Sequence, residues 1–391
     1  MINAELASLR REYSLFSPLT LVCLQINFAR WTQDVILQKY FFCNTFRVLD
    51  KVCQYLIEQV IEKGPQDPVE VVFRVVLFNL FTKIETWELL VKNLGPLTWT
   101  RYRRDRYLKV LTAAANRGMA LYTRAFIKPA PRFGHAENYK NHLSFLEVLM
   151  ENEFPHRLLA APYLANVFEY LVSLPSMGEF SAYQLMLSLS YTDVLNFHRN
   201  DFVITGPGSI SGLKKLFGRT MEKGFQSKKS FAIEIMRYLV ETQDQHFKRL
   251  GLAFSGLGPN KLPMDLSDIE HTLCEVDKYC RAAHPHLKGK RTHIKRAFEP
   301  STLYQAKQIL PKAWSHPSRT TPRLRPDKNL VIDKRYLIDK IKDHKSGPDG
   351  MRYLIYWVGY SAKDATWEPE HLLLADAPIV LSEYKAKMVS K

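Results

Sequence analysis

The stretch YLIYWVGYSAKDATWEPEHLL, residues 353–373, combines β-branched and aromatic residues with a Trp-Glu-Pro-Glu run near the end of the chain. The Tyr-, Ile- and Val-rich runs 335–345 and 352–360 flank SGPDG, a turn sequence whose glycines allow positive φ, so they predict a β-hairpin. TWEPEHL should add a third short strand, and 377–389 has apolar residues at helical spacing. The rings either form the core of a small domain or stand open around a ligand.

The order of these segments resembles a chromodomain; the resemblance covers about residues 331–389, and we assign residues 331–391 to this domain. It implies a three-stranded antiparallel sheet closed by a C-terminal helix. It also implies a methyl-lysine cage of three aromatic side chains, with an acid beside it and a methylated histone tail as partner. The matching cage positions are Tyr336, Trp357 and Tyr360, and the matching acid is Asp364. In so small a domain most other apolar side chains must be core, and we expect this of Trp367.

Two departures from that family bear on peptide binding. Leu372 stands where histone-reading members carry an Asn, and RLRPDKNLVIDKR (323–335) replaces an acidic approach segment. A basic approach repels a basic histone tail, so we expect only weak peptide affinity. The segment is also similar to chromodomains at the ends of gypsy-type retrotransposon integrases, which suggests a transposon origin.

The segment before the chromodomain-like region is strongly basic. Residues 285–330 contain eleven Lys or Arg against two acids, and they contain several prolines. This composition predicts an extended linker that folds only on a polyanion, if at all. The whole chain carries a formal charge of +16 and a pI near 9.5, which favours DNA as a partner. A merely basic, solvated surface is the alternative.

Residues 1–284 show apolar residues at helical spacing, as in RVLDKVCQYLIEQVIEK (47–63), and Pro/Gly clusters divide them into helical blocks. We therefore predict one large all-α domain, giving a multidomain protein with a basic linker and a small chromodomain. The five cysteines are an odd number in a large chain, so we expect free thiols in a reducing compartment. No stretch predicts a signal peptide or membrane span, and we expect a nuclear location.

Polar side chains interrupt two of the apolar helical blocks, where they need partners or a ligand. A solvated polar face is the alternative interpretation. The candidate DNA or base pocket consists of Asn44, Arg47, Asp50, Arg74, Asn79 and Lys83.

Two further motifs bear on chemistry. DFVITGPGSISGLKKLFG (201–218) opens a helix after a Gly-Pro-Gly turn, an arrangement that suits a phosphate, although an ordinary interhelical turn fits as well. IEHTLCEVDKYCRAAH (269–284) supplies candidate acids, and its Cys and His residues cannot converge on zinc from one continuous helix. We expect no metal or cofactor. The candidate phosphate ligands are Gly206, Gly208, Lys214 and Lys215, and the candidate acids or bases are Glu275 and Asp277.

Together, FFCNTFRVLDKVCQYLI, FNLFTKIETWELL, GPGSISGL and EHTLCEVDKY resemble the helical domain found with fungal and phage 5-hydroxymethyluracil DNA kinases. That group is related to thymine-hypermodification pyrophosphorylases and to DNA-glycosylase-like folds. The resemblance implies a domain that acts on, or binds, DNA carrying a modified thymine. No phosphate-binding Gly-Lys-Ser/Thr loop occurs, so we do not expect the kinase itself in this chain.

Two hypotheses follow for this chromatin-associated protein. In the first, the helical domain processes a flipped DNA base, with Glu275 or Asp277 as the acid. In the second, the protein is a non-catalytic DNA and chromatin adaptor of transposon origin. The hypotheses differ in whether the polar residues converge on one pocket.

Overall fold

The computed structural model of the chain describes residues 32–123, 129–228, 230–287, 289, 291–299, 308–332, 336–348, 350–358 and 360–389. The chain divides into two compact units, each discontinuous in sequence. Unit 1 combines Met1–Gln59 with Asn196–Arg325, and unit 2 combines Val60–Leu195 with Pro326–Lys391. The helical region is therefore divided between two units, whereas the sequence pattern suggests a single domain.

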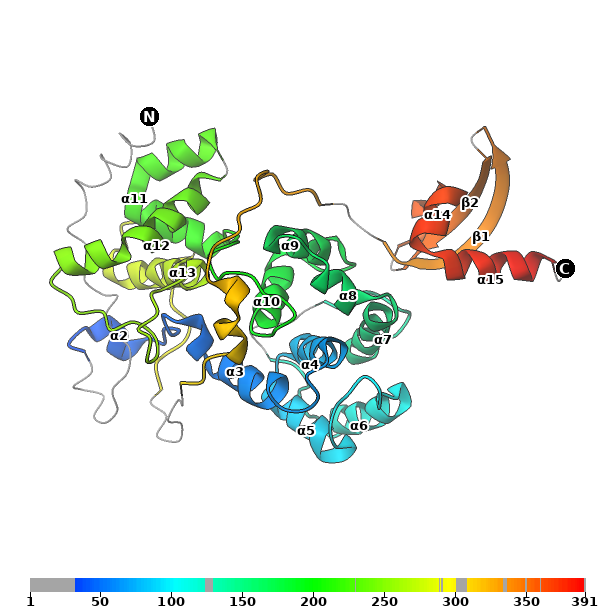
Figure 1. The fold of residues 1–391 in the computed structure, drawn as a ribbon, viewed down its shortest axis with the longest axis horizontal. Helices are drawn as coiled ribbons and strands as arrows, with labels where there is room; N and C mark the ends of the chain where they lie inside the picture. The colour runs from blue at the N-terminus through cyan, green and yellow to red at the C-terminus, as the bar shows by residue number, and fades with distance from the viewer. Residues whose placement is uncertain are drawn as a thin grey trace. The chain divides into compact units, whose positions relative to one another are not determined.

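Unit 1 is built around three long helices that lie together (Figure 1). Two glycines let α11 and α13 approach closely. A Cβ on Gly212 would lie 2.1 Å from the carbonyl oxygen of Leu273, and one on Gly208 would lie 2.8 Å from Sγ of Cys274. The glycines of the GPGSISG motif are thus required by helix packing. The described elements of unit 1 are α2 (Val35–Lys39), η2 (Arg47–Leu49), α3 (Lys51–Tyr55), α11 (Pro207–Ser227), α12 (Phe231–Arg249), α13 (Leu266–Ala283), η4 (Lys312–Ser315) and η5 (Pro317–Arg319).

The helical part of unit 2 is organised around α4, whose residues from Glu70 to Phe81 are all buried. Asp67 caps this helix by accepting from the N–H of Val69, and α7, α8 and α10 pack against it. The π-helical turn η3 (Leu56–Ile61) crosses the boundary between the units. The helices of this part are α4 (Pro68–Phe81), α5 (Ile84–Leu94), α6 (Arg104–Asn116), α7 (Asn138–Glu151), α8 (Phe154–Leu159), α9 (Leu164–Ser173) and α10 (Glu179–Leu189).

The C-terminal part, residues 336–389, forms a small sheet covered by helices. Strands β1 (Ile338–Gly347), β2 (Gly350–Trp357) and β3 (Thr366–Pro369) pair antiparallel in the order β1-β2-β3. Helices α14 (Glu370–Asp376) and α15 (Pro378–Val389) lie on one face of this sheet (Figure 1). The predicted hairpin, third strand and closing helix are confirmed, and α14 is an additional element.

The core of this sheet lies between the strands and the two helices, and its buried residues are Ile341, Tyr353, Ile355, Leu373 and Leu381. The prediction that Trp367 belongs to the core is wrong. Trp367 pairs with Leu354, the strand neighbour of both Tyr353 and Ile355. Because successive side chains of a strand point to opposite faces, this pair lies on the face away from the helices. There the Lys345 ammonium lies 4.1 Å from the Trp367 ring centroid.

The prediction of an unfolded linker is wrong for residues 308–325, which belong to unit 1. Gln54 exchanges two hydrogen bonds with the backbone of Ile309, of 2.9 and 2.8 Å. Arg319 is buried, and its Nε donates to Oδ1 of Asn196. The N–H of Arg323 donates to Oδ1 of Asp201 at 2.5 Å. This segment thus packs into unit 1 without a polyanion, and Arg319 is the basic side chain that it buries.

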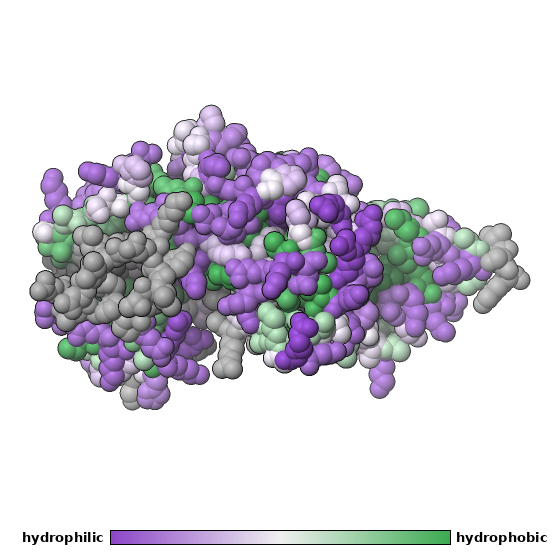
Figure 2. Space-filling model, turned by 90° about the horizontal axis from the view of Figure 1, so that it is seen from below, coloured by the Kyte–Doolittle hydropathy of each residue, from purple (hydrophilic) through white to green (hydrophobic). Residues whose placement is uncertain are grey.

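Most atoms in view in Figure 2 belong to hydrophilic residues. Among the residues that the structure describes, no helix is both long enough and apolar enough to cross a bilayer.

Candidate functional site

Three aromatic rings meet at one end of the sheet. Tyr336 precedes β1, Trp357 ends β2 and Tyr360 follows in the next turn. The Tyr336 ring centroid lies 5.9 Å from that of Trp357 and 5.5 Å from that of Tyr360, with interplanar angles of 61° and 81°. Tyr336 and Tyr360 are 51% and 54% exposed. A cation can approach rings so arranged within the roughly 6 Å at which ring faces attract it.

The Trp357 ring is held in place by hydrogen bonds. Its Nε1 donates to Oγ1 of Thr366 at 3.0 Å, and Thr366 donates on to Oε1 of Glu368 at 2.5 Å. The ring also packs against the sheet core. Sequence reasoning missed Thr366 and Glu368. Their position in the predicted third strand could have indicated them. Thr366 pairs with Ile355, and this pairing brings the Thr366 hydroxyl beside the end of β2.

Asp364 has a local role in the turn beyond Tyr360. Its Oδ2 accepts from the N–H and from the hydroxyl of Ser361, at 3.0 and 2.7 Å, and closes the turn η6 (Ala362–Asp364). Ser361 is the residue directly after Tyr360. The carboxylate is thereby held in the turn that follows the third ring.

Of the six residues of the predicted base pocket, three lie in unit 2 and bond within it. The Arg74 guanidinium is buried and donates to the carbonyl oxygens of Val60, Ile61 and Pro65, at 2.8 to 3.2 Å. Asn79 donates to the Ser188 hydroxyl, and Lys83 donates to a backbone carbonyl that follows α6. Arg74 therefore closes the end of η3, which is a structural function.

The other three lie in unit 1. Oδ1 of Asn44 accepts from the N–H of Phe46, and Asp50 caps α3. The N–H of Arg47 donates to Oδ1 of Asp268 at 2.8 Å. The six predicted residues thus belong to two different units, and neither unit contains the whole set.

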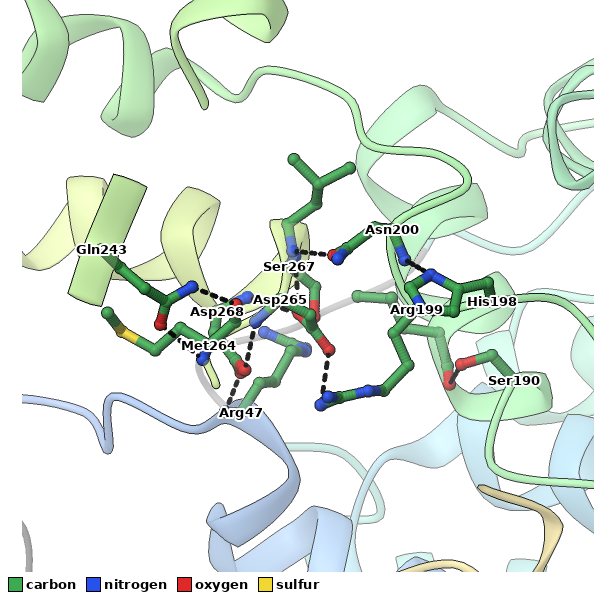
Figure 3. Close-up of polar contacts among 12 residues, drawn as sticks. Arg47, Ser190, His198, Arg199, Asn200, Gln243, Met264, Asp265, Ser267 and Asp268 are labelled. Carbon is green, nitrogen blue, oxygen red and sulfur yellow. Dashed lines mark hydrogen bonds and ion pairs between the residues drawn. The ribbon is translucent and has the colours of Figure 1, made fainter. Parts of the chain in front are cut away.

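Asp265 and Asp268, at the start of α13, lie beside Arg47 (Figure 3). Asp265 caps α13 by accepting from the N–H groups of Ser267 and Asp268, and Oδ2 of Asp265 lies 3.3 Å from Nη1 of Arg199. Asp268 is only 3% exposed. Burial, and next the charge of Asp265, raise the pKa of Asp268 well above its ordinary value.

The next turn of α13 adds two half-buried titratable groups, Glu270 and His271. Oε1 of Glu270 accepts from the N–H of Gly206 at 3.2 Å, and burial raises the pKa of Glu270 despite the opposing charge of Arg47. Burial, and then the charges of Arg47 and Lys278, lower the pKa of His271 to about 3. His271 is therefore neutral at pH 7. Sequence reasoning did not select these residues as acids or bases, although an acid and a His inside an amphipathic helix were a visible signal.

The predicted acids have partners inside unit 1. Oε2 of Glu275 accepts from Lys278 at 2.5 Å and from the N–H of Cys43 at 3.0 Å. Asp277 lies 2.9 Å from the Lys215 ammonium, and it also accepts from Ser211 and Arg281. Burial alone would raise the pKa of Asp277, but these hydrogen bonds outweigh it and lower the pKa.

The predicted phosphate turn is also used by the protein itself. The N–H of Gly206 donates to Ser209 and Glu270, Gly208 packs against Cys274, and Lys215 is paired with Asp277. Lys214 is the exposed cation of the predicted set.

The cysteines among the described residues, Cys43, Cys53, Cys274 and Cys280, are free thiols, whereas Cys23 lies outside those residues. Burial raises the pKa of Cys43 to about 11, so this thiol is protonated and unreactive at neutral pH. Within the described residues no group of Cys, His, Asp and Glu is placed to hold a metal ion.

Comparison with known proteins gives two family matches. Residues 24–289 match the model described as "5-hmdU DNA kinase, helical domain", and residues 336–387 match the Chromo (CHRromatin Organisation MOdifier) domain. The chain is 23% identical over 288 residues to the 5-hmdU DNA kinase of Bacillus phage SP10, an alignment covering 67% of this chain and 43% of the phage protein.

The chain thus spans less than half the length of that curated relative. No solved structure matches the chain significantly. The matched residues include the helices of both units and the three-stranded sheet. The chain therefore belongs to the family of the 5-hmdU DNA kinase helical domain, and it carries a chromodomain at residues 336–387.

Proposed function

We propose that this protein is a chromatin-associated, nuclear reader whose chromodomain binds methylated lysine of a histone tail and whose helical region binds DNA. The observation that carries the proposal is the arrangement of Tyr336, Trp357 and Tyr360, whose rings lie 5.5 and 5.9 Å apart and partly open to solvent. A methylated ammonium is weakly hydrated, and an aromatic face attracts it by about 0.5 to 2 kcal/mol.

The surroundings of the rings set the expected strength of binding. Leu372, on α14, is 44% exposed and offers no amide to a peptide backbone. The Trp357 ring is already ordered by Thr366, so binding does not have to order it. We expect dissociation constants on the order of tens to hundreds of micromolar.

The test is calorimetric titration of the full chain with histone peptides that carry either trimethyl-lysine or unmodified lysine at the same position. The methylated peptide should bind more tightly, and Tyr360→Ala should erase the difference. Tyr356→Ala is the matched control, because Tyr356 pairs with Lys340 on the strands outside the three-ring group. Equal binding of the two peptides across a broad histone array would contradict the proposal.

A second candidate function, chemistry on a modified thymine, is favoured by one observation. Arg47 of unit 1 lies near buried Asp268 and half-buried Glu270 and His271, and the pKa values of these three groups are all displaced. Perturbed titratable groups gather at functional sites more often than elsewhere. The relative from phage SP10 is named a 5-hmdU DNA kinase. DNA that contains 5-hydroxymethyluracil is therefore the substrate to test.

The experiment is to incubate the full chain with duplexes that contain thymine or 5-hydroxymethyluracil and to follow the base by mass spectrometry. An altered base that disappears in Glu270→Gln would support an enzyme. An unaltered base with retained DNA binding would support the non-catalytic adaptor.

A further inference from the structure

The first turns of α6 present a line of cations to solvent. In RYRRDRYLK (101–109), Tyr102 and Tyr107 are buried and anchor the segment, whereas Arg103, Arg106 and Lys109 are exposed. These three cations recur every third residue, so they lie along one side of the helix. We call them the α6 stripe.

Among the described residues, no acid pairs with a cation of the α6 stripe. In the part of the chain that the structure describes, Arg106 and Lys109 form no ion pair, and Arg103 donates only to the carbonyl oxygen of Tyr102. The neighbouring Arg104 differs, since it is bonded to Glu147 at 3.1 Å. Asp105 is the single acid between residues 101 and 109.

Two cations of the stripe, Arg103 and Arg106, lie at the N-terminal end of α6, where positive charge destabilises a helix. Cations are unfavourable at a helix N-terminus, where the macrodipole is positive. Arg103 occupies the N-cap and makes no side-chain capping bond there, although Ser, Thr, Asp or Asn would cap the helix better. Helix formation therefore does not explain Arg103 and Arg106, which lie at the N-cap and in the first turn.

Three cations of the linker, where the sequence alone placed DNA binding, already have partners in unit 1. Arg296 stacks on Phe41, and its guanidinium carbon lies 3.8 Å from the ring centroid. Arg319 is buried against Asn196, and Arg323 donates to the carbonyl oxygen of Asn196. These linker cations are engaged inside unit 1, whereas those of the α6 stripe are not.

We propose that the α6 stripe contacts the phosphate backbone of duplex DNA. From Arg103 to Lys109 the helix rises about 9 Å, and one strand of duplex DNA carries a charge about every 3.4 Å along the axis. The stripe thus faces two to three phosphates of a strand. This inference rests on the DNA-binding half of the proposed function and is independent of the aromatic rings.

The test uses the full chain and a short unmodified duplex, titrated by fluorescence anisotropy between about 0.05 and 0.2 M salt. In R103Q/R106Q/K109Q, the slope of log affinity against log salt should fall by about 1.8 to 2.7, because each of the two to three phosphate contacts contributes about 0.9. At about 0.15 M salt the same relation gives a loss of roughly a hundredfold. The matched control is K92Q/R132Q/R157Q, which removes the same charge from exposed positions outside the stripe.

Arg103→Ser separates binding from folding. Serine is a better N-cap, so the variant should unfold at a higher temperature than the wild type and yet bind DNA about fivefold more weakly. A lower unfolding temperature together with weaker binding would point to a structural role and overturn the inference.

The remaining outcomes are decisive as well. If the control triple variant weakens binding as much as the stripe variant, only net charge matters and the stripe is refuted. Tighter binding of the wild type to anionic vesicles than to duplex DNA would also refute the proposal. If the wild type binds no DNA, the DNA half of the proposed function fails; if wild type and stripe variant bind equally, only the stripe fails.

Discussion

Replacing Thr366 by Val should weaken methyl-lysine recognition without unfolding the chromodomain. The substitution nearly keeps the side-chain volume but removes the hydroxyl that accepts from Nε1 of Trp357 at 3.0 Å and donates to Glu368 at 2.5 Å. The indole then loses the contact that fixes its orientation toward Tyr336, whose ring centroid lies 5.9 Å away. Binding of a methylated lysine would have to order the ring first.

The expected loss of binding free energy in Thr366→Val follows from the type of hydrogen bond that is removed and from its exposure to water. A neutral hydrogen bond contributes about 0.5 to 1.5 kcal/mol net. Trp357 is half-buried, so water can replace the lost acceptor and the effect falls in the lower half of that range. We expect a loss of affinity for a trimethyl-lysine peptide of about 0.5 to 1 kcal/mol, which is roughly two- to fivefold. The free energy of unfolding should change by less than about 1 kcal/mol.

Calorimetric titrations of wild type, Thr366→Val and Thr366→Ser with methylated and unmethylated peptides measure this effect. Thr366→Ser keeps the hydroxyl and should bind like the wild type. The reasoning is refuted if Thr366→Val binds the methylated peptide as tightly as the wild type. An equal loss for both peptides would indicate damage to the peptide groove rather than to the ring.

Three further outcomes concern the helical region and are measured by denaturant unfolding. Gly212→Ala should cost about 2 kcal/mol or more, because its Cβ would lie 2.1 Å from a carbonyl oxygen of α13, whereas Gly178→Ala has open space and should cost less than about 1 kcal/mol. Arg74→Met should cost about 2 to 4 kcal/mol, because three backbone carbonyls lose their donor; a loss below about 1 kcal/mol would show that water replaces it. Lys215→Met should destabilise the protein at pH 7, because it removes one partner of buried Asp277. Since the folded pKa of Asp277 is lowered, its stabilisation is present above its ordinary pKa and is lost as the pH falls below that value. The variant should therefore lose less stability on acidification than the wild type, and an unchanged pH dependence would contradict this account.

The sequence predicted the chromodomain well because its signals are local. A turn of Gly and Pro, two β-rich runs and a short helix fix the order of the elements, and the hairpin and sheet are as expected. The error was Trp367. Residue type favours burial of an indole, but the strand register places it with Leu354 on the face away from the helices, and register depends on partners that are distant in sequence.

The helical region was harder to predict because polar residues in helices can be satisfied in many ways. Arg74 was selected as a polar group in apolar surroundings and Asp277 as a candidate acid, and each proved to be bonded to groups from another segment. The GPGSISG motif fits a phosphate turn equally well, and only the approach of α13 reveals why its glycines are needed. Such information lies in tertiary contacts rather than in local spacing.

The discontinuity of unit 1 has a consequence for biosynthesis. The hydrogen bond from Arg47 to Asp268 joins residues 221 positions apart. At ribosomal rates of about 5 to 20 residues per second, the early segment waits roughly 10 to 45 s before its partner is made. During that time Phe46, which is buried in the finished protein, lacks the ring of Phe254 on which it stacks. We therefore expect nascent chains to need protection by chaperones at their N-terminal end, and recombinant yield to depend on slow synthesis at low temperature.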